Sequence, residues 1–172
     1  MKLLRLNPID IANYIVWRHR NEDHFLTHLK LQKIMYYVVA KYLKDKDKLL
    51  FEDPIYKWQY GPVIKPVYHQ FKLFGKSKIK EPVSYLSSDS NYSGKGDFTI
   101  NFVDPEEICA TLDSDNEFKN VVLHVLKEFQ YSTAFDLVER THEESAWKNF
   151  ESQILNGIEL TYSKDELKSA NI

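Results

Sequence analysis

The chain has 172 residues, of which 43% are hydrophobic and 14% aromatic. This is enough apolar material for one compact domain over residues 1–172, and too much for a disordered tail. A single cysteine excludes an internal disulfide and a cysteine-rich zinc site. No apolar run reaches the length of a signal peptide or a membrane span, so we expect a cytoplasmic protein.

The net charge of −2 hides two unlike halves. Residues 1–80 carry 16 basic and 7 acidic side chains, a net charge of +9, whereas residues 81–172 carry 7 and 18, a net charge of −11. Such halves can pack against each other within one domain, associate between copies as a homodimer, or each face a partner of opposite charge.

Helices are predicted for the first third of the chain. Asn7 and Pro8 are a good cap and first residue for a helix that continues to about Arg20. Thr27 is the next cap, and apolar residues at helical spacing over 28–44 predict the strongest helix of the sequence. Its apolar face is wide, which indicates that other elements cover it on two sides.

The middle of the chain is less regular. Leu49–Tyr60 is interrupted by a proline and predicts a short strand or an irregular segment. Gly61-Pro62 breaks the chain, Pro66 fits the first turn of a short helix, and Gly75 ends that helix. The serine-rich stretch 84–96 is typical of a loop.

Strand-forming residues over 98–103 predict a strand or hairpin arm, and helices follow it to the end of the chain. These helices are expected after Asp104, from Asp115 to about Tyr131, after Ser132 or Thr133 with Phe135, Leu137 and Val138 facing inward, around Ala146–Phe150 up to Asn156-Gly157, and after Ser163. The sequence therefore predicts a mainly α (α+β) fold, a single compact helical domain with a small β-hairpin or sheet element.

No group of residues predicts catalysis. Cys109 lies among acidic residues, which favours a buried structural thiol over a nucleophile. Phosphate-binding glycine loops and nucleophile turns are absent, so we expect no enzyme and no cofactor. His24 and His28 have the spacing of two metal ligands on one helix face, but no thiol is near them, and whether they bind a metal stays open. His142 lacks the second histidine of a zinc-protease motif.

The basic half admits two kinds of partner. Lys65, Lys72 and Lys76 alternate with aromatic residues, as in some nucleic-acid-binding surfaces. The overall isoelectric point of about 6.3 and the scarcity of arginine favour an acidic protein as the partner. A nucleic-acid-binding regulator of its own operon remains the alternative.

Three blocks of sequence resemble one family. Leu29–Tyr37 (LKLQKIMYY), Tyr60–Tyr68 (YGPVIKPVY) and Leu137–Trp147 (LVERTHEESAW) are similar, in order and spacing, to motifs of the Panacea domain of SocA-like antitoxins, over residues 10–165. Family members often have proline where this chain has Ala146. The resemblance implies a cytoplasmic, prophage- or plasmid-associated antitoxin, which neutralises a cognate toxin protein by occluding it or by delivering it to a ClpXP-type protease.

We expect recognition through a basic helical face. In the first block Leu31, Ile34 and Met35 should face the core, while Lys30 and Lys33 face outward. Gly61-Pro62 should let the chain reverse between Tyr60 and Val63, and Thr141 or His142 should partner the Trp147 N–H. The predicted partner-binding residues are Lys30, Lys33, Tyr37, Lys41, Tyr60, Lys65, Tyr68, Lys72 and His142. Reversing Lys30, Lys33 and Lys65 to Glu is expected to weaken binding and leave the fold intact.

Overall fold

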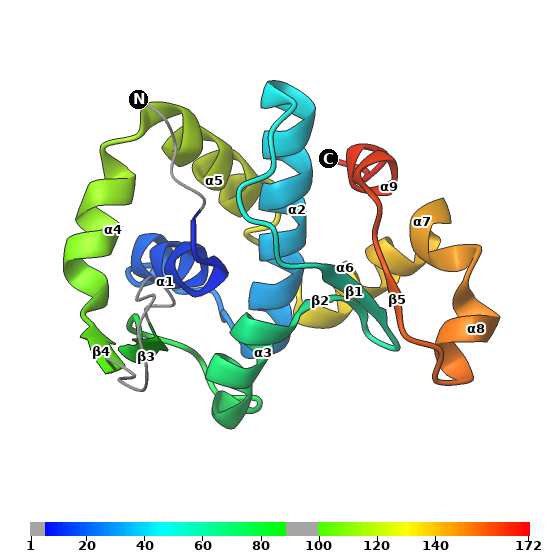
Figure 1. The fold of residues 1–172 in the computed structure, drawn as a ribbon, viewed down its shortest axis with the longest axis horizontal. Coiled ribbons are helices and arrows are strands. Elements are labelled where there is room, and N and C mark those ends of the chain that lie inside the picture. Colours follow the sequence, from blue (N-terminus) through cyan, green and yellow to red (C-terminus); the bar gives the residue numbers. More distant parts are fainter. Residues whose placement is uncertain (1–5, 89–99) are drawn as a thin grey trace, which may run out of the picture.

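The computed structural model describes residues 6–88 and 100–172, and its helices surround one long central helix (Figure 1). This helix, α2 (His28–Lys46), contacts α1 (Pro8–His19), α3 (Lys65–Phe71), α5 (Asn116–Glu128), α6 (Ala134–Glu143) and α9 (Lys164–Lys168). Every residue of 30–40 is buried, so this part of α2 is covered on all sides. The prediction of a wide buried face is confirmed, and the cover is more complete than expected.

The remaining helices are α4 (Pro105–Asp113), α7 (Ser145–Lys148), α8 (Glu151–Leu155) and a 3₁₀ turn, η1 (Lys72–Phe74). The predicted caps are confirmed at Asn7, Thr27 and Asp104, whose side chains accept hydrogen bonds from the first turns of their helices. Thr133 and Ser163 each form a reciprocal capping box, with Asp136 and Glu166. These local side-chain bonds fix where the helices begin.

Two small antiparallel sheets complete the described fold. The first has the order β2-β1-β5, with β1 (Ile55–Trp58), β2 (Gly61–Ile64) and β5 (Leu160–Thr161). The second pairs β3 (Tyr85–Ser88) with β4 (Ile100–Val103). In the first sheet Ile55 is opposite Ile64, and Trp58 is opposite Gly61. The mainly helical fold with a small β element is as predicted.

Several local predictions need correction. The chain reverses at Gln59-Tyr60, before Gly61 and Pro62, which belong to β2. The expected helix around Ala146–Phe150 is divided into α7 and α8. Phe135 points outward and is 62% exposed. Part of the expected loop forms β3, and its residues 89–96 lie outside the described residues.

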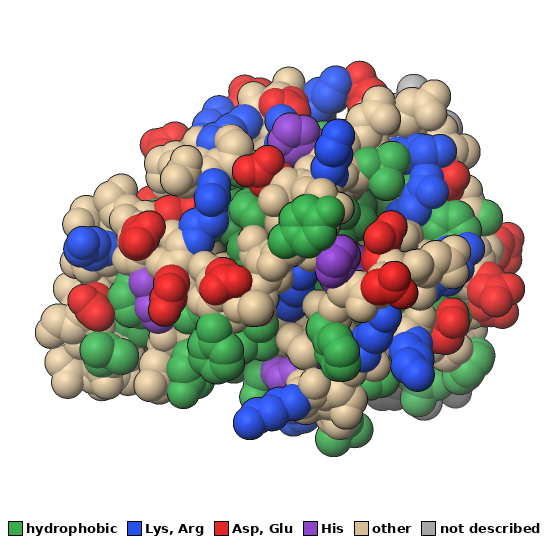
Figure 2. Space-filling view, turned by 180° about the vertical axis from the view of Figure 1, so that it is seen from behind, with side chains coloured by type: hydrophobic (Ala, Val, Ile, Leu, Met, Phe, Trp, Pro, Cys, Tyr) green, Lys and Arg blue, Asp and Glu red, His purple; other side chains and the backbone are tan. Residues whose placement is uncertain are grey.

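The two oppositely charged halves pack against each other. Ion pairs join Lys46 to Glu117 and Lys57 to Glu166, each at 2.6 Å, and Lys65 to Glu159 at 2.9 Å. Figure 2 shows acidic and basic side chains interspersed over one face, with no continuous basic area. The interpretation as one domain with complementary halves therefore explains much of the charge asymmetry.

Two further observations concern the described part of the chain. Cys109 is fully buried, and burial raises the pKa of its thiol to about 12, which agrees with a structural role. No described helix combines the length and the apolarity needed to cross a membrane.

Candidate functional site: an aromatic groove at the start of α2

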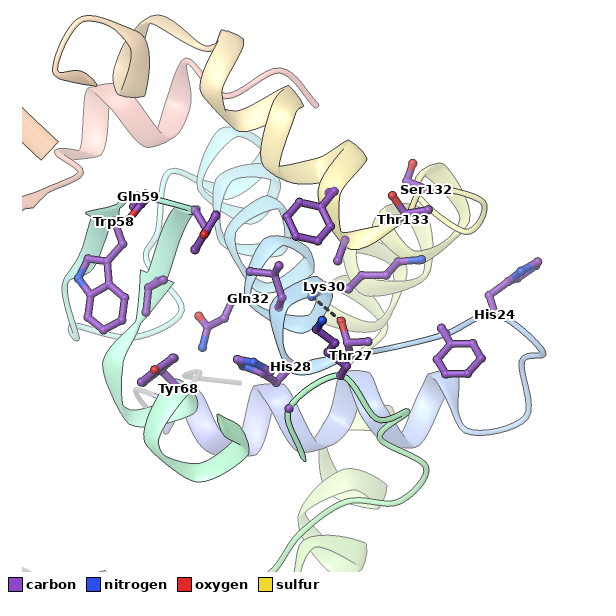
Figure 3. A pocket seen from close by; sticks show the side chains of 18 of the residues that line it. His24, Thr27, His28, Lys30, Gln32, Trp58, Gln59, Tyr68, Ser132 and Thr133 are labelled. Atoms are coloured by element: carbon purple, nitrogen blue, oxygen red, sulfur yellow. Dashed lines mark hydrogen bonds between the residues drawn. The ribbon is translucent and has the colours of Figure 1, made fainter. Parts of the chain in front are cut away.

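A groove of about 1010 Å³ opens beside the N-terminal end of α2. Figure 3 shows Trp58 and Tyr68 on one side of it, Ser132 and Thr133 on the other, and His28, Lys30 and Gln32 of α2 between them. The groove is lined by residues 24, 25, 27–30, 32, 58–60, 63, 68, 75, 76 and 130–135. Three stretches far apart in the sequence, 24–32, 58–76 and 130–135, therefore build one concave surface.

Aromatic side chains stand exposed around this groove. Phe25 is 64% exposed, Tyr60 53% and Tyr131 78%. Tyr60 packs edge-on against Phe135, with ring centroids 6.4 Å apart, and His24 packs edge-on against Tyr131 at 5.0 Å. Exposed large apolar side chains gathered around a concavity are typical of a binding surface.

The floor of the groove is polar. Lys30 is only 4% exposed, and its Nζ donates to the Gln130 carbonyl at 3.4 Å. Burial lowers the pKa of this ammonium. Burial, with the nearby positive charge of Lys33, also lowers the pKa of His28, so its imidazole is mostly neutral at pH 7.

Side chains of α2 close the outer edge of β2. The Gln32 amide donates to the Ile64 carbonyl at 3.3 Å and accepts from the Ile64 N–H at 2.8 Å. Lys33 donates to the Pro62 carbonyl at 3.1 Å, and Pro62 has no N–H. Since alternate residues of an antiparallel edge strand point their polar groups outward, this edge has its hydrogen-bonding groups occupied.

Behind the groove, Lys33 lies at a tight junction. Gly61 has φ +87°, and a Cβ built there would be 2.6 Å from the Thr141 Oγ1 and 2.9 Å from the Lys33 Cε. Lys33 is fully buried, and burial lowers its pKa to about 7. The junction joins α2, β2 and α6 and leaves no room for a side chain at residue 61.

A buried carboxylate holds the adjoining part of α2. Glu144 accepts from the Tyr36 hydroxyl at 2.6 Å, the Tyr37 hydroxyl at 3.1 Å and the Asn171 N–H at 3.0 Å. Nearby, the Trp147 indole N–H donates to the Trp58 carbonyl at 2.9 Å. The expected partner from Thr141 or His142 is thus wrong, since the acceptor lies 89 residues away in β1.

The nine predicted partner-binding residues lie in different environments. Lys30, Tyr60 and Tyr68 line the groove. The other six lie elsewhere. Lys41 pairs with Asp45, and Lys65 pairs with Glu159. Lys72 is exposed, with its Nζ 6.0 Å from the centre of the Tyr68 ring, and the His142 ring stacks on Trp147 with centroids 3.6 Å apart, while Lys33 and Tyr37 are buried.

The predicted orientation of Lys30 and Lys33 is wrong, because both are buried. Tyr37 is also fully buried, where its hydroxyl donates to Glu144, and it is not part of the protein surface. The cause is the cover of residues 30–40 of α2, which leaves that part of the helix no solvent-facing side for charged residues. Their ammonium and hydroxyl groups find internal acceptors instead.

Sequence reasoning missed several groove residues, among them Phe25, Trp58, Tyr131 and Phe135. Phe25 and Tyr131 lie in polar surroundings outside any periodic apolar pattern, which is the one signal that marks them as exposed. Phe135 fits the inward spacing of its helix and gave no such signal. His24 and His28 face different tyrosines, Tyr131 and Tyr68. Within the described ranges no three His, Cys, Asp or Glu residues come close enough to hold a metal.

One known family model matches the chain. The family model described as "Antitoxin SocA-like, Panacea domain" matches residues 31–148, more than half of the sequence. No curated protein and no solved structure matches the chain significantly. The matched range contains most of the groove and the whole Lys33 junction. On this match the chain belongs to the family of SocA-like antitoxins with a Panacea domain.

Proposed function

We propose that this chain neutralises a cognate toxin protein by binding it, and that the aromatic groove is the surface of contact. Family membership supports the antitoxin role. The observation that carries the choice of surface is the set of exposed aromatic side chains around one large concavity. Tyrosine and other aromatic residues supply most of the binding energy in many protein interfaces.

The proposal moves the contact away from the basic face expected from the sequence. Two of its lysines are buried, and Lys41 and Lys65 already have carboxylate partners. The interspersed surface charges favour a protein partner over nucleic acid. Neutralisation then works by recognition in the cytoplasm, with no bond made or broken by the antitoxin.

The test uses the product of the adjacent reading frame, expressed with this chain. Phe135→Ala and Tyr131→Ala should each weaken the complex about 10-fold or more, because aromatic anchors of an interface carry such losses. Phe102→Ala is the matched control, since Phe102 is 72% exposed and lies outside the groove. Equal affinity of all three variants would show that another surface binds. Failure of the chain to bind the toxin or to restore growth would refute the function itself.

Occlusion and delivery to a ClpXP-type protease are separated by the lifetime of the toxin. In cells that lack the protease, an occluding antitoxin still restores growth. An adaptor restores growth only when the protease is present, and it shortens the toxin half-life.

A further inference from the structure

None of the Asp and Glu residues in the described part of the chain lines the groove. Lys30 and Lys76 do line it. The first residues of α2, a helix of 19 residues, also line it, and helix N-termini carry a partial positive charge. The electrostatic character of the groove is therefore positive on an apolar background.

The ammonium group of Lys30 has weaker hydrogen bonding than that of a second buried lysine, Lys57. Lys57 is 3% exposed, and its ammonium bonds to the Glu166 carboxylate at 2.6 Å. Lys30 is 4% exposed, but among the described residues its ammonium has one hydrogen-bond acceptor, the Gln130 carbonyl at the long distance of 3.4 Å. A buried ammonium costs free energy unless a counter-charge or several acceptors compensate it. Asp136 lies near enough to raise the pKa of Lys30, but its carboxylate accepts from the Thr133 N–H and forms no ion pair with the lysine. Lys30 is thus a buried cation at a binding surface with no direct carboxylate contact among the described residues.

The closed edge of β2 limits how a partner can bind. Gln32 and Lys33 occupy the outward polar groups of Ile64 and Pro62, so a peptide cannot extend the sheet at this strand. A partner must instead insert side chains between the aromatic residues.

From these three observations we infer that the groove receives an apolar segment of the toxin that carries one carboxylate, and that this carboxylate pairs with Lys30. The inference rests on the proposed function and adds the chemistry of the partner. The apolar side chains of the segment pack on Phe25, Tyr131 and Phe135. Its carboxylate forms the direct ion pair that Lys30 lacks, in a site from which the bound segment excludes water.

The test is a double-mutant cycle between this chain and the toxin. Lys30→Met keeps most of the apolar stem and removes the charge, and it should weaken the complex about 30-fold or more. In a scan that changes each toxin Asp to Asn and each Glu to Gln, at least one change should cause a similar loss against the wild-type chain. The same change should cause little further loss against Lys30→Met. Lys41→Met, outside the groove, is the control and should bind as the wild type does.

The possible outcomes distinguish failure of the carboxylate inference from failure of the proposed contact surface. If Phe135→Ala weakens binding while Lys30→Met does not, the carboxylate inference is refuted and the groove remains the contact surface. If neither change weakens binding, the proposed surface fails as well. Should Lys30→Met fail to fold, the toxin scan against the wild-type chain decides, and a scan in which no carboxylate matters refutes the inference.

Discussion

Lys33 and Gly61 are in such close contact that a Cβ on residue 61 would lie 2.9 Å from the Lys33 Cε. Thr141 closes the same point from α6. One of these residues comes from each of the three sequence blocks that resemble the Panacea domain. The blocks are far apart along the chain, and the fold brings them together at one buried junction beneath the groove. Their shared role is therefore to fix the hairpin and α6 against α2.

Gly61→Ala should destabilise the protein by about 2–4 kcal/mol, since it adds a left-handed backbone cost of about 1–2 kcal/mol to the cost of overpacking. Gly157→Ala is the matched control. Gly157 has a similar φ of +80°, but a Cβ there meets nothing within 4 Å. Urea unfolding of both variants isolates the steric part, and equal losses would contradict a tight junction.

The stability of the protein should rise between pH 7.5 and 8.5, below the range in which ionisation of Cys109 and of the buried tyrosines in the unfolded chain opposes the effect. Burial lowers the pKa of Lys33 in the folded state to about 7, against an ordinary value of 10.5. Over this range the unfolded chain binds a proton that the folded protein does not. The free energy of unfolding then increases with pH, by up to about 1.4 kcal/mol per pH unit from this one group. Below pH 7 both states hold the proton, so this lysine no longer makes the free energy of unfolding change with pH.

Lys33→Met removes this titration. Urea unfolding at pH 7.5, 8.0 and 8.5 should show a shallower rise in the free energy of unfolding for the variant than for the wild type. Above pH 8.5 the cysteine and the tyrosines of the unfolded chain begin to ionise, so the comparison ends there. Parallel pH profiles for the two proteins would show that Lys33 keeps its proton when folded.

Charge reversal should lower the thermal stability of the protein far more at Lys33 than at Lys65, although the sequence predicts that both lysines are exposed. Lys33→Glu places a carboxylate against the Pro62 carbonyl in a fully buried site, with an expected loss of more than about 4 kcal/mol and no cooperative thermal transition. Lys65 pairs with Glu159 at the surface, so Lys65→Glu should shift Tm only slightly. Similar thermal transitions for both variants would contradict the burial of Lys33.

Local signals explain why the helices could be predicted. The caps at Asn7, Thr27 and Ser163 act through residues within three positions of themselves, and the apolar spacing of α2 is visible over a few turns. Strand β5 could not be found this way. It has two residues, and it exists because Tyr56 and Lys57 of β1 pair with it from more than 100 residues away.

The candidate site was only partly predictable for the same reason. Tyr60 and Tyr68 were identified because they begin and end the second block that resembles the Panacea domain. The burial of Lys33 depends on a carbonyl 29 residues further along, in a strand that the sequence did not predict. A charged residue on a helix is normally predicted to face solvent. Lys33 does not, because the hairpin and α6 pack over it.

The hydrogen bonds to Glu144 should be a source of stability. Tyr36→Phe should cost about 2 kcal/mol, because it removes a 2.6 Å bond to a buried carboxylate. Tyr37→Phe removes a longer bond of 3.1 Å to the same group and should cost less. Tyr131→Phe, at a position 78% exposed, is the control and should leave unfolding by urea unchanged.

These tyrosine variants also test whether Tyr37 serves the fold or the partner. If Tyr37 acts only inside the protein, Tyr37→Phe lowers the free energy of unfolding while the affinity of the folded protein for the toxin stays the same. The affinity is measured at a temperature well below the transition, where nearly every molecule is folded. A variant with wild-type stability and weakened binding would instead mean that α2 opens during recognition and exposes Tyr37. The buried Glu144 makes that costly, because opening would leave its carboxylate without two of its three donors.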